Sequence, residues 1–169
     1  MSLLTWTILI PLLGSAAIFL NRKRPEQSKY IALVSAIITM LMAVIVYFSF
    51  NREDIQFQLS QTLDWIPSLG ISFAVGVDGL SLPLFILTTL LTTLVVIFSW
   101  DVEHRAPLYF GLLMILETGV LGVFAALDFF LFYIFWEIVL IPMFFIIGIW
   151  GGPRKEYASI KFLIYTHVA

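Results

Sequence analysis

The chain has 169 residues, of which 61% are hydrophobic and only 12% are charged, and its mean hydropathy is +1.03. A water-soluble domain of this length needs far more polar surface, so the composition predicts an integral membrane protein made mainly of spanning helices. The net charge is −2 without a basic, aromatic-rich face, which argues against a nucleic-acid partner. The absence of cysteine excludes disulfides and thiolate-bound metal or iron–sulfur clusters in this chain.

Five apolar runs are long enough to cross a bilayer, since about 18–22 residues at about 1.5 Å each match a hydrocarbon core of about 30 Å. In chain order they are Leu3–Leu20, Tyr30–Phe50, Leu80–Trp100, Pro107–Leu127 and Phe129–Trp150. A sixth segment, Glu156–Ala169, begins like another helix but provides only about 21 Å. Its last carbonyls would end inside the membrane without partners. The predicted fold class is therefore all-α integral membrane, with five full transmembrane helices and a truncated sixth. We expect the N-terminal piece of a longer protein or a truncated gene product.

The basic residues predict the orientation of these spans. When the loops are assigned to alternate sides, one side carries Arg22, Lys23, Arg24, Lys29, Arg105, Arg154 and Lys155, and the other carries Arg52 beside Glu53, Asp54 and Asp64. Positively charged loops stay on the inner side of a membrane. We therefore expect the N-terminus and the loop Asn51–Gly79 to lie outside.

The outer loop is the one sizeable extramembrane segment of the predicted topology. Alternating residues in IQFQLSQTLDW and GISFAVGVD indicate a short β-hairpin within residues 51–79, lying on the outer face. Asp78 is placed to cap the start of the third span, and we favour this structural role over a functional one.

Glu137 is the most informative residue, because it is the only charged side chain in the run Phe129–Trp150 and lies near its centre. An ionised carboxylate at that depth costs about 2.5–3.5 kcal/mol on insertion scales. Such residues typically serve as proton or ion relays or pair with a buried charge. The structural alternative is that the Glu137 carboxyl group forms a hydrogen bond to a facing helix and only stabilises the packing of the two helices.

Glu117 is a second carboxylate, at the centre of the fourth predicted span. Only Asp128 separates that span from the next, so the two spans form a tight antiparallel hairpin. Glu117 and Glu137 then lie about 16 Å and 14 Å from the turn. The sequence does not show whether the two side chains face one another. Two carboxylates in low dielectric do not both ionise without a nearby cation, which suits a proton relay.

Lys161 is the candidate cation, although it lies shallower than the glutamates and its ammonium group can instead reach the membrane interface. Tyr133 lies one turn before Glu137 and can share its face. His104 belongs to a solvated loop cluster. His167 has no nearby ligand set, so no metal site is expected.

A family resemblance follows from longer motifs. The stretch LDFFLFYIFWEIVLIPMFFIIGIWGG, followed by RKEYASIKFLIYT, closely resembles subunit M (chain 4) of respiratory complex I. This type of subunit also occurs in NAD(P)H and F(420)H(2) relatives and in Mrp-type cation/proton antiporters. VGVDGLSLPLFILTT and GVLGVFAALD resemble the family as well, so the match runs from about Val75 to Thr166. The Trp-Glu-x4-Pro element with its following Trp-Gly-Gly is specific to the antiporter-like group.

The resemblance implies roles for parts of the chain. Residues 1–50 would form two N-terminal helices, residues 51–79 the outer-face loop, and residues 80–169 the start of the antiporter-like domain. Glu137 matches the family's coupling glutamate, which pairs with a lysine on a seventh span beyond this sequence. The resemblance therefore implies that the 169 residues alone do not translocate protons. No cofactor is expected on this chain, whereas flavin, iron–sulfur clusters and quinone are expected in partner subunits.

The resulting hypothesis is a non-redox membrane subunit of a complex I-type NAD(P)H/F(420)H(2):quinone oxidoreductase. It would couple electron transfer in partner subunits to proton translocation through Glu137, with Glu117 as a candidate second relay carboxylate. Its partners would be other antiporter-like membrane subunits in an energy-converting membrane, prokaryotic in the first place, or thylakoid or mitochondrial. Two alternatives stay open: a subunit of a Mrp-type Na⁺/H⁺ antiporter, and an inactive truncated fragment.

Overall fold

The computed structural model describes residues 2–51, 56–66, 68 and 70–168. The described part contains the helices α1 (Leu3–Leu20), α2 (Gln27–Ser49), α3 (Ser81–Phe98), α4 (Ala106–Ala125), α5 (Phe129–Trp150) and α6 (Lys155–Val168), and the strands β1 (Gln58–Ile66) and β2 (Ile71–Val77). Helices α1 and α5 have the predicted bounds, and the ends of α2, α3 and α4 differ from the prediction by at most three residues.

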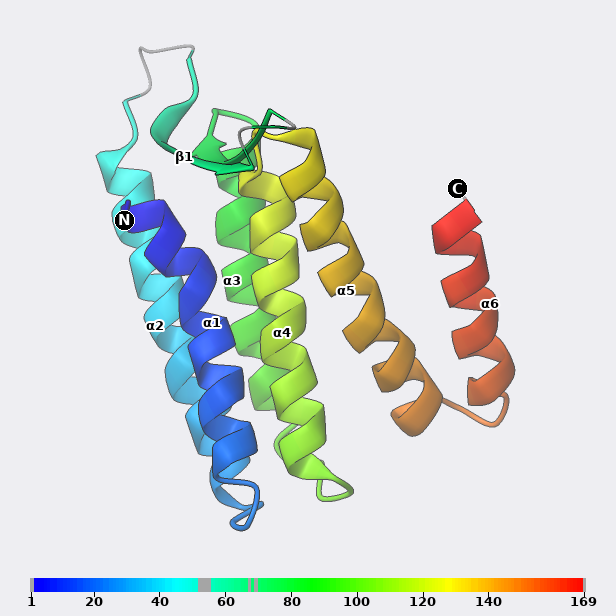
Figure 1. The fold of residues 1–169 in the computed structure, drawn as a ribbon. Coiled ribbons are helices and arrows are strands. Elements are labelled where there is room, and N and C mark those ends of the chain that lie inside the picture. The colour runs from blue at the N-terminus through cyan, green and yellow to red at the C-terminus, as the bar shows by residue number, and fades with distance from the viewer. Residues whose placement is uncertain (1, 52–55, 67, 69, 169) are drawn as a thin grey trace.

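The five long helices α1–α5 are each long and apolar enough to cross a membrane. The predicted class, an all-α integral membrane protein with a small hairpin, is therefore confirmed. The shorter α6 has 14 residues and follows α5 after a tight connection. The connections from α1 to α2, α3 to α4 and α5 to α6 all lie at one end of the molecule, so the basic loops share a side (Figure 1).

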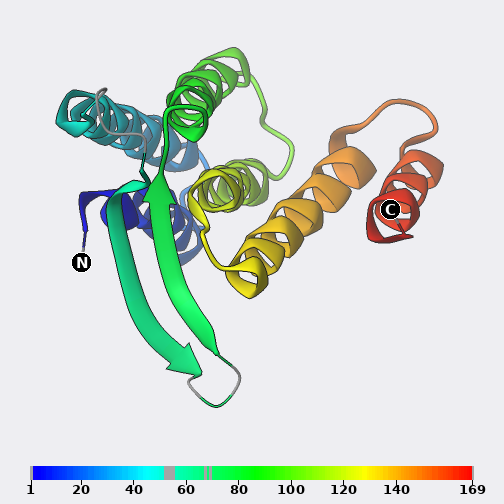
Figure 2. The same ribbon diagram turned by 90° about the horizontal axis from the view of Figure 1, so that it is seen from above.

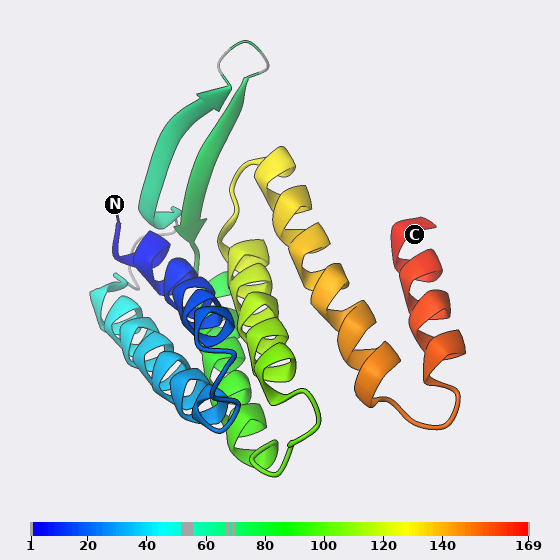
Figure 3. The same cartoon turned by 60° about the horizontal axis from the view of Figure 1, so that its bottom comes forward.

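Helices α1–α4 pack together as a bundle, while α5 lies along α4, and α6 packs mainly on α5 (Figures 1 and 3). Gly119 and Gly122 form the surface of α4 that meets α5. A Cβ atom at Gly119 would lie 2.8 Å from a Val139 methyl group, and one at Gly122 would collide with the Phe135 ring. These two glycines therefore allow the two helices of the α4–α5 hairpin to approach closely.

The bundle core consists of two apolar clusters at different heights. The hairpin-end cluster contains Leu4, Ile8, Ala43, Val46, Leu82, Phe85, Leu121 and Ala125 among others, and the loop-end cluster contains Ile18, Ala32, Ala36, Val96, Phe110, Leu113 and Met114 among others. Between them, on α2, α3 and α4, most of the buried residues are polar. Thr39 on α2, Thr89 and Thr93 on α3, and Glu117 on α4 occupy this intermediate level, and we refer to these four residues as the polar layer.

Strands β1 and β2 form the antiparallel hairpin that the sequence predicts, with Gln58 opposite Val77 and Ile66 opposite Ile71. Seen from above, the hairpin lies across the ends of the helices and extends past them (Figure 2). The Asp78 carboxylate accepts hydrogen bonds from the backbone N–H groups of Leu80 and Ser81 at 3.1 Å and 2.7 Å, so its predicted capping role at α3 is confirmed. These bonds hold the pKa of Asp78 below its usual range, the Ser81 N–H having the largest effect.

The side of the membrane on which the hairpin lies is still a prediction. Three of the charges used for it, Arg52, Glu53 and Asp54, lie outside the described residues.

Candidate functional site

The start of α5 fixes the height of Glu137. The Asp128 carboxylate caps this helix by accepting hydrogen bonds from the backbone N–H groups of Phe130 (2.9 Å) and Leu131 (3.1 Å), and it also accepts one from Ser72 of the hairpin (3.3 Å). The pKa of Asp128 is lowered as a result, chiefly by the Leu131 N–H group. Glu137 lies eight residues after the first residue of α5, or about 12 Å along a helix about 33 Å long. It therefore lies in the interior of the helix, about 12 Å from one end and about 20 Å from the other.

The partner of Glu137 in this structure is His167, near the end of α6. Its Nε2 atom lies 3.2 Å from Glu137 Oε2. The other ring nitrogen, Nδ1, lies 3.0 Å from the backbone carbonyl oxygen of Leu163. Because a carbonyl oxygen only accepts, this contact assigns the hydrogen to Nδ1 and leaves Nε2 to face the carboxyl group.

One proton can therefore occupy either side of the Glu137–His167 contact. With the proton on Nε2, the pair is an imidazolium and a carboxylate. With the proton on Glu137, the carboxyl group donates to a neutral ring nitrogen. The Tyr133 side chain, one turn earlier on α5, also hydrogen-bonds to Glu137, as its predicted position on the same face allows. The site thus contains three adjacent groups that can exchange a proton.

The pair is partly open to its surroundings, since the Glu137 side chain is 29% exposed and that of His167 is 42% exposed. It lies between α5 and α6, on a side of α5 that the α1–α4 bundle does not cover.

Glu117 and Glu137 do not face one another. The surface of α4 that meets α5 is marked by Gly119 and Gly122. At about 100° per residue, Glu117 lies about 200° around the helix from Gly119, on the side of Leu113 and Leu121, which pack into the α1–α4 core. Glu137 in turn contacts α6. The two carboxyl groups have similar depths, but α4 separates them.

The surroundings of Glu117 differ strongly from those of Glu137. Its side chain is only 1% exposed. Within the part of the chain that the structure describes, neither of its oxygens has a hydrogen-bond partner. Buried polar groups are normally paired, so the unpaired carboxyl group of Glu117 is an exception among the buried residues of the bundle.

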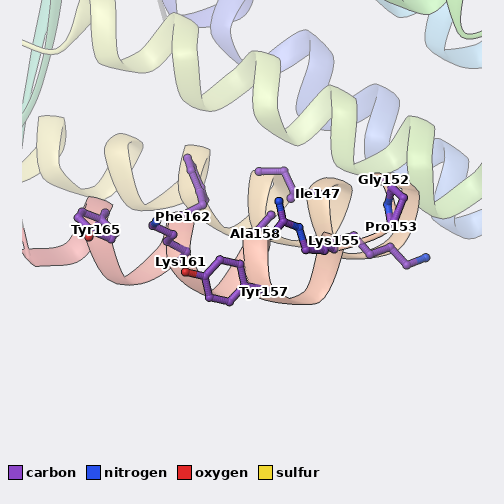
Figure 4. A pocket seen from close by; sticks show the side chains of 11 residues that line it. Ile147, Gly152, Pro153, Lys155, Tyr157, Ala158, Lys161, Phe162 and Tyr165 are labelled. Carbon is purple, nitrogen blue, oxygen red and sulfur yellow. The ribbon is translucent and has the colours of Figure 1, made fainter.

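Lys161, the cation suggested from the sequence, lies on another face of α6. Its Nζ atom is 5.7 Å from the centre of the Tyr157 ring and 5.6 Å from that of Tyr165. Figure 4 shows the three side chains along an open groove formed by α6 and the end of α5. The structure does not bring Lys161 to Glu137, and the described residues record no ion pair between them.

His104 lies in the connection between α3 and α4, where its backbone carbonyl accepts a hydrogen bond from the Trp150 indole at 2.9 Å. No group of three or more His, Cys, Asp or Glu residues that could hold a metal ion is found in residues 2–51, 56–66, 68 and 70–168.

Sequence reasoning missed His167 as a partner of Glu137, because it was considered only as a metal ligand. A usable signal was present in the spacing. Glu137 lies 13 residues before the end of α5 and His167 lies 12 residues after the start of α6, so both are about 18–20 Å from the connection between these helices. Lys161 is only about 9 Å from it.

The C-terminal part of the chain, which contains the site, matches a known protein family. The family model described as "NADH:quinone oxidoreductase/Mrp antiporter, TM" matches residues 126–169, which include Glu137, Lys161 and His167 but not Glu117.

Curated proteins match nearly the whole chain. The chain is 37% identical to the "F(420)H(2) dehydrogenase subunit M" of Methanosarcina mazei, over 96% of this chain and 33% of that protein. It is 39% identical to the "NAD(P)H-quinone oxidoreductase chain 4" of Prochlorococcus marinus subsp. pastoris, over 88% of this chain and 27% of that protein. The chain thus spans about a third of the length of these relatives.

Solved structures share the fold. A chain of "Respiratory complex I from Thermus thermophilus with bound NADH" superimposes with a TM-score of 0.81 at 24% identity, over 98% of this chain and 33% of that one. A chain of the Mrp complex from Dietzia sp. gives a TM-score of 0.79 at 18% identity, over 98% and 18% of the two chains. At these identities the likeness extends to the fold alone.

Proposed function

We propose, from the premise that the chain belongs to the family of NADH:quinone oxidoreductase and Mrp antiporter membrane subunits, that it serves in a proton-translocating oxidoreductase of the complex I type. In this role it does not transfer electrons. It moves protons across the membrane in response to electron transfer elsewhere in the assembly. The names of the relatives support NAD(P)H or F(420)H(2) as the class of electron donor and a quinone as the acceptor.

The observation that supports this proposal most directly is the contact between Glu137 and His167 at mid-span. A charge at that depth is costly unless it is paired, and this pair can change its internal proton position without creating a net charge. We propose that Glu137 is the relay and ion-pair residue, that His167 exchanges its proton, and that Tyr133 orients the carboxyl group. Lys161 is retained as a proposed interfacial cation rather than as the direct partner.

Further parts of the proposal concern the assembly. Residues 80–169 would form the start of the antiporter-like domain, preceded by the outer-face loop 51–79 and by two helices in residues 1–50. We propose neighbouring antiporter-like membrane subunits as partners, with flavin, iron–sulfur clusters and quinone held by other subunits. The membrane would be a prokaryotic cell membrane in the first place, with the N-terminus and the hairpin outside.

Replacing Glu137 by Gln in the intact assembly tests the proposal. The amide keeps the shape of the side chain but does not release a proton, so donor-driven proton uptake into inverted vesicles should be abolished while assembly is preserved. Glu156→Gln is a matched control, because it makes the same change at the loop end of α6 and should leave pumping unchanged. Normal pumping in the Glu137→Gln variant would refute the role of Glu137.

The two alternatives predict different results. A Mrp-type subunit would exchange Na⁺ for H⁺ down an imposed gradient without any electron donor. We propose that the 169 residues alone do not translocate protons, because α5 carries no charged side chain other than Glu137 that could pass a proton towards either membrane face. Proton flux through this chain alone in liposomes would contradict that statement.

A further inference from the structure

The polar layer of the α1–α4 bundle has a chemistry that the Glu137 site does not explain. Three of its four members lie at similar heights, and Thr93 lies one turn further from the hairpin end than Thr89. Glu117 lies eight residues from the hairpin end of α4, and Thr89 lies eight residues from the same end of α3, so both are about 12 Å from it. Thr39 is ten residues from the corresponding end of α2, or about 15 Å. All are buried, with apolar clusters on both sides along the helix axes.

The threonine hydroxyl groups of the layer already use their hydrogens. Thr39 donates to the Ser35 carbonyl at 2.9 Å, Thr89 to the Ile86 carbonyl at 2.8 Å, and Thr93 to the Thr89 carbonyl at 2.8 Å. Each hydroxyl oxygen keeps lone pairs that can accept a hydrogen bond. The layer therefore contains hydroxyl oxygens that can still accept a hydrogen bond. An ionised carboxylate can only accept, whereas a protonated carboxyl group can donate.

No positive charge compensates Glu117 from the helices that pack against its side of α4. Helices α1 and α3 contain no Asp, Glu, Lys, Arg or His, and Glu117 is the one such residue of α4. Helix α2 contains only Lys29, ten residues from Thr39, whose ammonium group lies 4.9 Å from the Trp100 ring centre at the loop end. An unpaired buried charge is strongly unfavourable, whereas the neutral acid fits an acceptor-lined layer.

We propose that the polar layer is a second proton-binding site of this protein, in which Glu117 holds one dissociable proton as a neutral carboxyl group and shares it with threonine oxygens and water. Neither Glu117 oxygen has a described protein partner at hydrogen-bonding distance, and we therefore include a water molecule between the carboxyl group and a hydroxyl in the proposed site. The ligand class is a proton together with water. The site goes beyond the proposed function, because it requires neither electron transfer nor Glu137.

The second site is separate from the first. Glu117 lies on the side of α4 opposite Gly119, the residue that contacts α5, and Glu137 contacts α6. A proton could pass between the two carboxyl groups only around α4. The protonation of Glu117 is therefore expected to be independent of changes at Glu137.

Infrared spectroscopy of the protein in its native assembly in lipid tests this inference. Carboxyl-labelled glutamate should give a neutral carboxylic acid band at neutral and mildly alkaline pH, where solvent-accessible glutamates are ionised. One component of the band should disappear in Glu117→Gln, and the same component should keep its frequency in Glu137→Gln. It should shift in frequency in Thr89→Val, which removes one acceptor while keeping the shape of the side chain.

Each outcome bears on the inference. If the wild-type protein gives no such band, or if the band survives in Glu117→Gln, Glu117 does not hold the proton. If Glu137→Gln removes or shifts the component that Glu117→Gln removes, the two sites are not separate. Should Glu117→Gln fail to assemble, the Thr89→Val shift in the labelled protein still decides, because a band unaffected by that change lies outside the polar layer. None of these readings depends on whether the assembly pumps protons.

Discussion

His167→Gln is the most informative change to the candidate relay, because it keeps a polar side chain of similar reach but removes the ring nitrogen that can take up a proton. At the observed 3.2 Å, two unit charges attract by about 5 kcal/mol at an effective dielectric constant of about 20. The side chains are 29% and 42% exposed, and fully exposed pairs retain at most about 1 kcal/mol. We therefore expect the variant to lose about 2 kcal/mol of stabilisation, or about thirtyfold in the rate of a proton step that uses this pair.

The assay is donor-driven proton uptake by vesicles that contain the intact assembly, with electron transfer recorded in parallel. Thr166→Val is the control, since its hydroxyl group bonds only to carbonyl oxygens of its own helix, at 2.7 Å and 3.1 Å, and the Nδ1 contact of His167 is unaffected. Pumping within twofold of wild type in His167→Gln would refute a shared proton.

The other predictions concern Lys161, the contact between α4 and α5, and the Asp128 cap of α5. Lys161→Gln should leave pumping within about threefold of wild type, because Lys161 lies beside two tyrosine rings and not at Glu137. A loss as large as that of His167→Gln would show that Lys161 takes part in the proton step. Gly122→Ala should destabilise the protein by about 1–3 kcal/mol in thermal unfolding, because the new methyl group collides with the Phe135 ring. Gly152→Ala is the control, because a methyl group at that position meets no described atom within 4 Å. The lowered pKa of Asp128 stabilises the fold above the unfolded-state pKa of about 3.9, and this contribution is lost as the pH falls through the lower folded-state value. Asp128→Asn should accordingly flatten the acid limb of melting temperature against pH, and an unchanged limb would show that the cap does not contribute.

Much of the architecture follows from local sequence signals. The bounds of α1 and α5 coincide with apolar runs because a membrane helix needs an uninterrupted apolar surface of fixed length. The β1–β2 hairpin follows from alternation, and the Asp78 cap from residue type and position. Each of these features depends on only a few neighbouring residues.

Whether Glu117 and Glu137 face one another was harder to predict, because it depends on how each helix is rotated about its axis. Depth can be counted along the chain, whereas rotation is set by packing between helices. Gly119 and Gly122 do mark the α5-facing side of α4, and the angle of Glu117 could have been measured from them. The contact between Glu137 and His167 also depends on the path of the α5–α6 connection, which no periodic pattern encodes.

The attachment of the β-hairpin has a consequence for the Glu137 site some distance below it. The Ala74 carbonyl accepts a hydrogen bond from the Leu127 N–H group at 2.8 Å, and Val75 forms a bridge with Ala126, so the hairpin is joined to the turn immediately before α5. Gln61 on the other strand accepts a hydrogen bond from Thr5 of α1 at 2.8 Å. A displacement of the hairpin along its strands by one residue, about 3.3 Å, would pull the start of α5 sideways by a similar amount and change the position of Glu137 relative to His167. An antibody fragment or cross-link that grips the hairpin from the water could therefore stop proton transfer without entering the membrane.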